Sequence, residues 1–295
     1  MTNGARPLYF ATNLEHRNLT EDDLLAVTAL AERGVPVLPL VWTESDPASL
    51  PDGAMVILRS TWDYHRRPAA FGRWIAGLEA RGVRLLNEPA LIRWNLDKHY
   101  LKELDAAGVS TIPTLWLPLG ARKSLDALLS AAGWSTAVVK PTVSAGARDT
   151  TIVRSGDGAA ERSFAELHRE VDLMVQPYLA EIERDGEWSL VFLDGEYSHA
   201  VLKRPAQGDF RVQTELGGTV SSGLPPDVAL RAGRRAMECL PSSPPLYARI
   251  DGVVAGDEFL VMEAECIEPG LFFAEDPSAA SHFADCLVAR LTHAL

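Results

Sequence analysis

The chain has 295 residues, of which 47% are apolar and 23% charged, and its formal net charge is −12. This composition is typical of a globular protein with more than one domain, and the negative charge argues against nucleic acid or an anionic membrane as a partner, although a local basic cleft can still hold a nucleotide. We expect a cytoplasmic protein for three reasons. The three cysteines lack metal-ligand spacing, the sequence shows no signal-peptide core, and no apolar run approaches the ~20 residues of a membrane helix.

The first 95 residues alternate between short apolar runs and amphipathic stretches, with glycine or proline between them. Thr20 is placed to cap a helix that Gly34 ends, because a hydroxyl before an acidic first turn satisfies the first helical N–H groups. A second helix is expected over 68–81. Strands are expected over 8–11, 35–40, 55–58 and 83–86. Strands and helices that alternate in this way predict an α/β domain over 1–95 with a mainly parallel sheet.

A polar and aromatic loop, Arg59-Ser60-Thr61-Trp62-Asp63-Tyr64, follows the third of these strands. Ligands bind beyond the carboxyl ends of strands in open α/β sheets, so the loop is a candidate substrate pocket. Arg59 suits a carboxylate and Asp63 an amine, which predicts a small polar zwitterion as the substrate. We assign to this pocket Arg59, Ser60, Thr61, Asp63 and Tyr64. A solvated corner or a contact between two copies of the chain explains the same residues equally well.

Two lysines are candidates for binding phosphate in an expected middle domain, 96–175. Lys98 lies in the first turn of a helix expected over 95–107, where the helix dipole disfavours a cation, and such local conflicts are commoner at functional sites. Lys140 ends an apolar strand, and a loop of small and hydroxyl residues follows it over 142–150. Such a loop can fold over phosphates, although it lacks the Walker A order. A plain hairpin with an exposed lysine is an equally good interpretation.

The remaining residues, 176–295, consist of strands joined by short turns and predict a largely antiparallel α+β domain. Gln176-Pro177-Tyr178-Leu179 follows a buried strand, and Pro177, which has no N–H, leaves neighbouring backbone groups for an adenine edge. A hairpin is expected over 187–202, and Lys203-Arg204-Pro205 follows it. Helices are expected over 226–240 and 277–293.

The strongest single pattern is a hairpin that turns at Gly256-Asp257. Asp251 lies on its first strand, and Glu263 and Glu265 lie on the second. Because the period of a strand is two residues, Glu263 and Glu265 point to the same face. Neighbouring carboxylates on an apolar strand are costly unless a cation compensates them, and Mg²⁺ that holds substrate phosphates is the usual case. A hairpin with solvated carboxylates remains the alternative.

In their order along the chain, these motifs resemble the ATP-grasp superfamily, in particular the branch of bacterial glutathione synthetase and the ribosomal-protein glutamate ligases. The motifs are Lys98, Lys140-Pro141 with its small loop, Gln176-Pro177-Tyr178-Leu179, Glu187, Gly208-Asp209-Phe210-Arg211 with Gly217-Gly218, Arg249-Ile250-Asp251 and Glu263-Ala264-Glu265. The resemblance covers about residues 95 to 275. It implies an α/β plus α+β protein in which a pre-ATP-grasp α/β domain over 1–95 precedes an ATP-grasp fold of two α+β lobes over 96–175 and 176–295.

The resemblance also implies roles for single residues. ATP would be bound by Lys98, Lys140, Val143, Ser144, Gly146, Gln176, Tyr178, Leu179 and Glu187, with 143–147 as a phosphate lid and Tyr178 and Leu179 as the adenine hinge. One or two Mg²⁺ ions would be held by Asp251, Glu263 and Glu265. Catalysis would use Arg211, Arg249 and Lys140, and the substrate would also meet Arg204, Arg211, Gln213 and Gly218. The chain departs from the family where Glu265 and Gln213 replace a typical asparagine.

The implied reaction is activation of a carboxylate by ATP to an acyl phosphate, followed by attack of a nitrogen nucleophile to form a C–N bond. The loop 59–64 is similar to one in ATP-grasp cyclo-ligases that convert O-ureido-D-serine to D-cycloserine in antibiotic biosynthesis. The resemblance therefore implies a small polar amino-acid-like substrate, and relatives lead us to expect a homo-oligomer, either a dimer or a tetramer. The alternatives are an intermolecular amino-acid or peptide ligase, a kinase acting on a small molecule, and a nucleotide-binding module without ligase activity.

Overall fold

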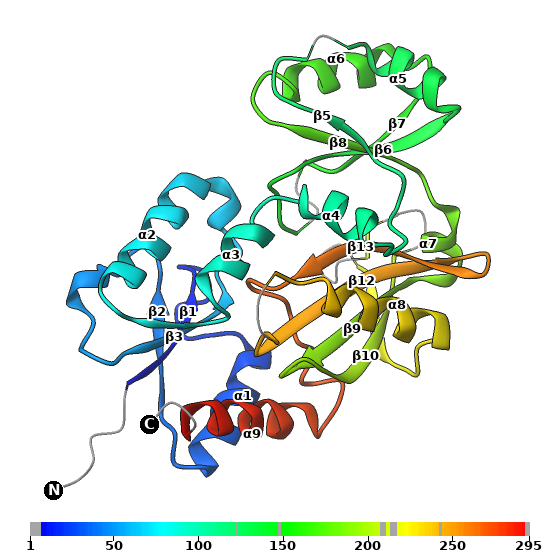
Figure 1. Cartoon of the computed structure of the whole chain (residues 1–295). Coiled ribbons are helices and arrows are strands. Elements are labelled where there is room, and N and C mark those ends of the chain that lie inside the picture. Colours follow the sequence, from blue (N-terminus) through cyan, green and yellow to red (C-terminus); the bar gives the residue numbers. More distant parts are fainter. Residues whose placement is uncertain are drawn as a thin grey trace, which may run out of the picture.

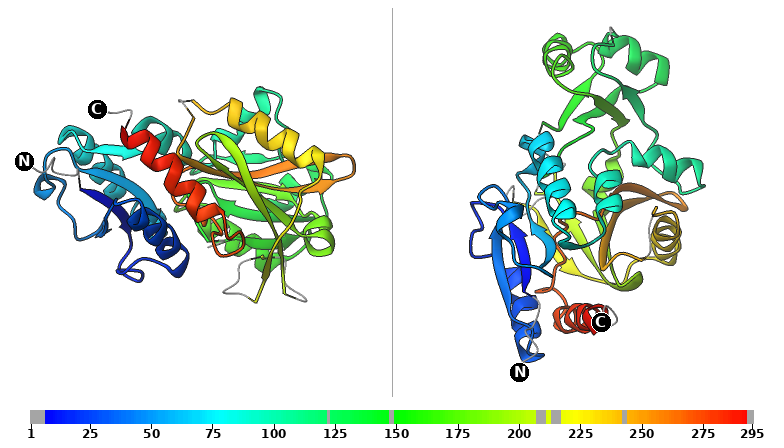
Figure 2. Two further views of the ribbon diagram at one scale, coloured as in Figure 1. Left: turned by 90° about the horizontal axis from the view of Figure 1, so that it is seen from below. Right: turned by 60° about the vertical axis from the view of Figure 1, so that its left-hand side comes forward.

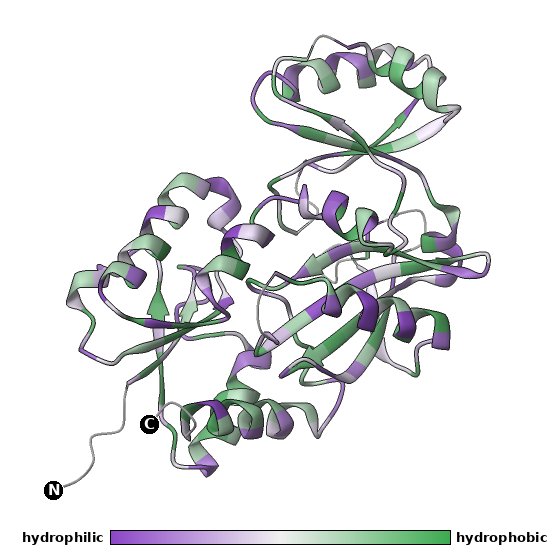
Figure 3. Cartoon of the chain, in the orientation of Figure 1, coloured by the Kyte–Doolittle hydropathy of each residue, from purple (hydrophilic) through white to green (hydrophobic). Residues whose placement is uncertain are grey.

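The computed structural model describes residues 7–121, 123–146, 149–206, 211–212, 217–241 and 244–292. Within them the chain forms three sheets in sequence order, each covered by helices (Figure 1). Apolar residues dominate the strands at the centres of the sheets, whereas the outer helices alternate between apolar and polar residues (Figure 3). Among the described residues, none of the helices combines the length and the apolar composition that a membrane crossing requires.

The N-terminal sheet is parallel, as predicted, with the strand order β2-β1-β3-β4. Its strands are β1 (Leu8–Thr12), β2 (Val37–Val41), β3 (Met55–Ser60) and β4 (Arg84–Leu86), and its helices are α1 (Glu21–Glu32), α2 (Pro68–Ala80) and α3 (Pro89–Asn95). Thr20 caps α1 by accepting a hydrogen bond from the N–H of Asp23. Every residue of β3 is buried, because helices and neighbouring strands enclose this central strand.

The middle sheet is antiparallel, with the order β5-β8-β6-β7, and α5 and α6 cover it at the end of the molecule farthest from α9 (Figure 1). Its strands are β5 (Leu115–Leu117), β6 (Thr136–Pro141), β7 (Thr151–Arg154) and β8 (Leu173–Pro177). The helices are α5 (Leu125–Ala132) and α6 (Gly158–Leu167), and α4 (Tyr100–Ala106) precedes them. Gly133 ends α5 in the left-handed conformation, which a glycine adopts without a steric penalty.

The C-terminal sheet is antiparallel, with the order β11-β10-β9-β12-β13. Its strands are β9 (Glu187–Leu193), β10 (Glu196–Arg204), β11 (Thr219–Ser222), β12 (Tyr247–Ala255) and β13 (Glu258–Glu265). The helices are α7 (Ala180–Asp185), α8 (Asp227–Glu238) and α9 (Ala279–Thr292). The predicted hairpin is formed by β12 and β13, with a bulge after Asp251. Gly252 at this bulge leaves no room for a side chain, because a Cβ there would lie 2.5 Å from the Phe259 ring.

Helix α9 joins the N-terminal and C-terminal sheets, and Figure 2 shows it crossing between them. The Phe283 ring on α9 packs against Phe10 of β1 and Tyr247 of β12, with ring centroids 6.3 and 6.4 Å away. All three side chains belong to one buried cluster. The N-terminal sheet is thereby held beside the C-terminal sheet by a shared core. The division at residues 95 and 175 stays a prediction.

Candidate functional site

A cleft of about 1450 Å³ lies where the three sheets meet. The floor comes from β12 and β13, one side comes from the middle sheet and the β6–β7 loop, and another comes from the N-terminal domain. Fifteen of the predicted site residues line it: Asp63, Tyr64, Lys98, Lys140, Ser144, Gly146, Gln176, Tyr178, Leu179, Glu187, Arg211, Arg249, Asp251, Glu263 and Glu265. The cleft therefore brings together most of the residues that the sequence suggested.

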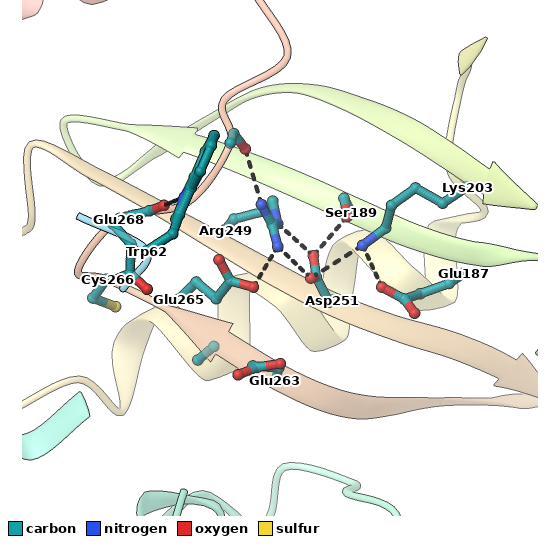
Figure 4. Close-up of polar contacts among 12 residues, drawn as sticks. Trp62, Glu187, Ser189, Lys203, Arg249, Asp251, Glu263, Glu265, Cys266 and Glu268 are labelled. Carbon is teal, nitrogen blue, oxygen red and sulfur yellow. Dashed lines mark hydrogen bonds and ion pairs between the residues drawn. The ribbon is translucent and has the colours of Figure 1, made fainter. Parts of the chain in front are cut away.

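The floor of the cleft carries an arginine held between two carboxylates (Figure 4). Arg249 Nε donates to Asp251 Oδ1 and Nη2 donates to Oδ2, both at 2.8 Å, and Nη2 also pairs with Glu265 Oε1. The hairpin register creates this group, because Arg249 lies opposite Glu265 and Asp251 lies opposite Glu263. Arg249 is 8% exposed, so its guanidinium has a fixed orientation toward the cleft.

Lys203 extends this network and was not among the predicted site residues. Its ammonium pairs with Glu187 and lies 3.2 Å from Asp251 Oδ2 (Figure 4). The sequence assigned Arg204 to the substrate instead. Because neighbours on a strand point to opposite faces, Lys203 is buried and lines the cleft, whereas Arg204 is exposed and lies outside the described lining, so its assignment stays a prediction that this geometry does not support. The sequence could have indicated Lys203, because the strand that contains it pairs with the strand of Glu187, and side chains along a strand alternate between its two faces.

A third basic residue, Lys98, connects the floor to the loop that follows β6. Its ammonium donates to the Ser144 carbonyl oxygen at 2.7 Å and lies 2.9 Å from Glu263 Oε1. Lys98 lies in the turn between α3 and α4 rather than in the first turn of a helix. Its N–H donates to the Thr142 carbonyl at 2.9 Å, which attaches this turn to the same loop.

The charges of the floor change the proton affinity of its members. Burial, together with the negative charges of Glu263 and Asp251, raises the pKa of Glu265 to about 7 in spite of the attraction to Arg249. Burial also lowers the pKa of Lys140, and the nearby Lys98 adds to this shift. Desolvation is the main cause of both shifts, and the like charges nearby add to it. The cleft therefore has a surplus of negative charge on one strand and a weakened cation opposite.

The predicted metal ligands are not assembled around one point in this conformation. Among the described residues, no three histidine, cysteine or acidic side chains are grouped as a metal ion would require. Asp251 is fully engaged by Arg249, Lys203 and the Ser189 hydroxyl, which donates at 2.6 Å. The side chains of Glu263 and Glu265 are 28% and 26% exposed, so their oxygens can reach the cleft. These two carboxylates fit a divalent cation, and Asp251 does not while it holds its three partners.

The segment predicted to bind adenine joins β8 to α7 beside the cleft. Gln176 is buried and donates to the Thr114 hydroxyl at 2.9 Å, and the N–H of Tyr178 donates to the Thr136 carbonyl at 3.2 Å. Leu179 lines the cleft at the first turn of α7. Of the predicted phosphate lid, Ser144 and Gly146 line the cleft, whereas Val143 does not, and residues 147–148 lie outside the described part of the chain.

Arg59 and its neighbours do not form the predicted substrate pocket. Strand β3 continues through Ser60, two residues beyond its predicted end, so Arg59 is inside a buried strand. Its Nε donates to Asp23 Oδ1 at 2.8 Å, Ser60 also donates to Asp23, and the guanidinium lies 5.3 Å from the Tyr247 ring centroid. Arg59 is 2% exposed and does not line the cleft. Ser60 and Thr61 are also buried, and they do not line it either. These three residues therefore lie outside the lining of the cleft in this structure, and their assignment to substrate stays a prediction that this geometry does not support.

The second half of the loop does reach the cleft. Asp63 accepts a hydrogen bond from Trp42 Nε1 at 2.6 Å and pairs with Arg67 at 3.6 Å, so its charge is already compensated. Tyr64 is buried against Phe71. Trp62, which was not assigned a role, donates from Nε1 to the Glu268 carbonyl oxygen at 3.0 Å. The loop thus forms the N-terminal side of the cleft and contacts the segment that follows β13.

The loop between β10 and β11 is described only in part. Arg211 is half-buried and lines the cleft, Gly218 does not, and Gln213 lies outside the described residues. A further acidic residue, Glu268, lines the cleft but was not predicted. Burial, together with Glu265 and Glu263, raises the pKa of Glu268 well above its usual range. Its place three residues after Glu265, before Pro269-Gly270, is the signal in the sequence that could have identified it.

Comparisons with known proteins identify relatives of the chain. A family model described as the N-terminal domain of D-cycloserine synthetase DcsG matches residues 8–87. The chain is 33% identical over 253 residues to the cycloserine biosynthesis protein DcsG of Streptomyces lavendulae, a match that covers 80% of this chain and 83% of that protein. The crystal structure of D-cycloserine synthetase DcsG matches with a TM-score of 0.85 and 27% identity, over 96% of this chain and 99% of that one.

More distant solved structures share the fold. The D-alanine–D-alanine ligase of Bacillus anthracis, solved with ATP, matches with a TM-score of 0.69 and 19% identity over 98% of each chain. Other solved ATP-grasp proteins match as well, one of them a ligase in complex with Mg and ADP. The predicted fold, an α/β domain followed by an ATP-grasp fold, is confirmed.

Proposed function

We infer the function from sequence similarity and from the geometry of the cleft. The chain belongs to the family of the D-cycloserine synthetase DcsG. We propose that it is an ATP-dependent ligase that converts O-ureido-D-serine to D-cycloserine. The observation that carries the proposal is Arg249, which is buried on the floor of the cleft, pairs with Glu265 and shares Asp251 with Lys203. Fixed cations beside paired carboxylates are what phosphoryl transfer from ATP to a carboxylate requires.

The nucleotide would lie between the middle and C-terminal sheets. Leu179 would contact adenine, Glu187 would accept hydrogen bonds from ribose, and Lys98 and Lys140 would bind the phosphates. Mg²⁺ would be held by Glu263 and Glu265 and would neutralise charge on the phosphates. The excess negative charge that raises the pKa of Glu265 supports this assignment, since a cation would relieve it. Arg249 and Lys203 would orient the transferred phosphoryl group.

The substrate would lie on the N-terminal side, where Trp62, Asp63 and Tyr64 line the cleft. The domain that supplies these residues is the one that the family model matches, which supports a shared substrate class. Its carboxylate would accept the phosphoryl group, and the ureido nitrogen bonded to oxygen would then displace phosphate and close the five-membered ring. The carbamoyl group on that nitrogen, which D-cycloserine lacks, would be removed by hydrolysis as carbon dioxide and ammonia. The side chains around the cleft would exclude water from the labile acyl phosphate. A cytoplasmic location and a homo-oligomeric state remain part of the proposal.

The test measures ADP release with O-ureido-D-serine and with a panel of amino acids, alone and in pairs. The proposal expects turnover with O-ureido-D-serine alone and formation of D-cycloserine. Turnover only with pairs would replace it by an intermolecular ligase. Trapping with hydroxylamine yields a hydroxamate only from an acyl phosphate, so ADP release without hydroxamate would indicate a kinase. A chain that binds ATP but releases no ADP under any of these conditions would be a nucleotide-binding module.

A further inference from the structure

Glu268 is fixed at the junction between the floor and the N-terminal side of the cleft. It follows β13, its main-chain oxygen accepts the hydrogen bond from Trp62, and Figure 4 shows the two residues on the side of Glu265 away from Lys203. Only 7% of its surface is exposed, and the residue lines the cleft. Trp62 comes from a segment 206 residues earlier in the chain, so the position of Glu268 depends on the assembled domains.

The Glu268 carboxyl has no hydrogen-bond or ion-pair partner among the described residues, in contrast to Asp251, Glu187 and Glu265. The negative charges of Glu265 and Glu263 act on it more strongly than the positive charges of Lys98 and Arg249. A buried carboxylate without a partner is costly, and one beside other carboxylates is more so. The cleft therefore contains a buried carboxyl group without a partner in the described part of the chain, and a positively charged ligand beside it would favour its ionised form.

The location of this group matches the chemistry of an amino acid. Arg249, which would face the transferred phosphoryl group, donates from Nη1 to the Gly270 carbonyl at 3.0 Å, two residues beyond Glu268. The ammonium of an α-amino acid is separated from its carboxylate by a single carbon. An ammonium ligand must therefore lie close to the place where the carboxylate is phosphorylated, and Glu268 and Arg249 are attached to the same short loop.

We propose that the Glu268 carboxylate binds the ammonium group of the amino-acid substrate and thereby selects substrates that carry it; the inference rests on the ligase function proposed above. Asp63, to which the sequence assigned this role, already compensates its charge through Trp42 and Arg67. Asp22, another acidic residue of the cleft, differs from Glu268 because its carboxylate already has a partner: it accepts a hydrogen bond from the N–H of Ala274 at 3.1 Å.

The experiment combines Glu268→Gln with a substrate that lacks the amino group. Removing either the carboxylate or the ammonium is expected to lower kcat/KM by about 10- to 100-fold, as for a charge-assisted hydrogen bond. Removing both is expected to cost little more than removing one, because each deletion abolishes the same contact. The KM for ATP should stay within a few-fold of that of the wild type. Glu258→Gln, at the exposed start of β13, is the matched control and should leave kcat/KM for both substrates and the KM for ATP at their wild-type values.

The proposal is overturned if the losses of kcat/KM from Glu268→Gln and from the missing amino group multiply when both groups are removed. It is also overturned if the loss from the missing amino group does not multiply with the loss from Asp22→Asn, because Asp22 would then be the group that binds the ammonium. Glu268→Met provides a second variant of similar length, and thermal unfolding verifies that each variant is folded. If the wild type turns over O-ureido-D-serine but the cycle is additive, Glu268 has been misassigned while the proposed function stands. If the wild type activates a different amino acid, the proposed function fails, and the same cycle with that amino acid and its analogue without the amino group still tests Glu268.

Discussion

Two buried arginines in this protein each pair with a buried aspartate, and only one of them belongs to the cleft. Arg59 and Asp23 are 2% and 1% exposed, and Ser60 and the Tyr247 ring enclose them. Arg249 and Asp251 are 8% and 3% exposed, but Glu265, Lys203 and the cleft surround them. The first pair is closed to a ligand, although Arg59 Nη1 is buried without a hydrogen-bond partner among the described residues, whereas the second is part of a larger set that remains open to a ligand.

The comparison teaches that burial and ion pairing do not by themselves identify a functional arginine. A closed pair replaces lost hydration with one partner and connects two elements, here α1 and β3. An open pair keeps further charges within reach, so that a ligand can change the partners of each group. Asp23–Arg59 should therefore contribute to stability, and Asp251–Arg249 to the reaction.

The largest effect is expected from Arg249→Met, which removes the fixed cation of the open pair. We expect kcat to fall by about 10²–10³-fold, as when one preorganised donor to a developing charge is lost. Steady-state ADP release measures it, and circular dichroism verifies the fold. Arg59→Met is the matched variant at the closed pair, and its folded fraction should keep the wild-type kcat. Equal losses of kcat in the two folded variants would contradict the distinction between the pairs.

Asp23→Ala should act on stability, because it leaves Arg59 buried without its partner. Breaking a buried ion pair costs about 3–5 kcal/mol of unfolding free energy, which urea denaturation measures. Asp23→Leu combined with Arg59→Met should recover part of this loss, since no charge then remains unpaired. A large drop in kcat at unchanged stability would instead give the closed pair a role in the reaction.

The smallest effect is a pH dependence that belongs only to the open pair. Glu265 has a usual pKa of 4.5 that is raised to about 7 in the folded protein. The folded state therefore holds this proton more tightly than the unfolded state, and the contribution of Glu265 to stability decreases as the pH rises from about 4.5 to about 7. Without Mg²⁺, the difference between the unfolding free energies of Glu265→Gln and the wild type should therefore shift by about 1–3 kcal/mol in favour of the variant as the pH rises across this range.

Urea denaturation at several pH values measures this difference, and Glu258→Gln should show none. Mg²⁺ with ATP should stabilise the wild type near pH 7 and reduce its gap to Glu265→Gln, because the cation favours the ionised carboxylate. A difference that does not change with pH would show that the negative charge on the floor is already compensated.

The sequence by itself determined features that follow from local periodicity. The β12–β13 hairpin, the shared face of Glu263 and Glu265, and the cap at Thr20 depend on residues within a few positions of one another. The order of the motifs pointed to the ATP-grasp fold. Periodicity also contained the choice between Lys203 and Arg204, since neighbours on a strand point to opposite faces.

Only the tertiary structure decided which charges are compensated and which remain open to a ligand. Asp23 meets Arg59 across 36 positions of the chain, and Trp62 meets Glu268 across 206. Arg59 looked like a loop residue because polar side chains follow Leu58, yet pairing with β1 extends the strand and α1 supplies its counter-charge. The sequence shows that a charge is present, but the cost of burying it depends on neighbours that only the folded chain brings together.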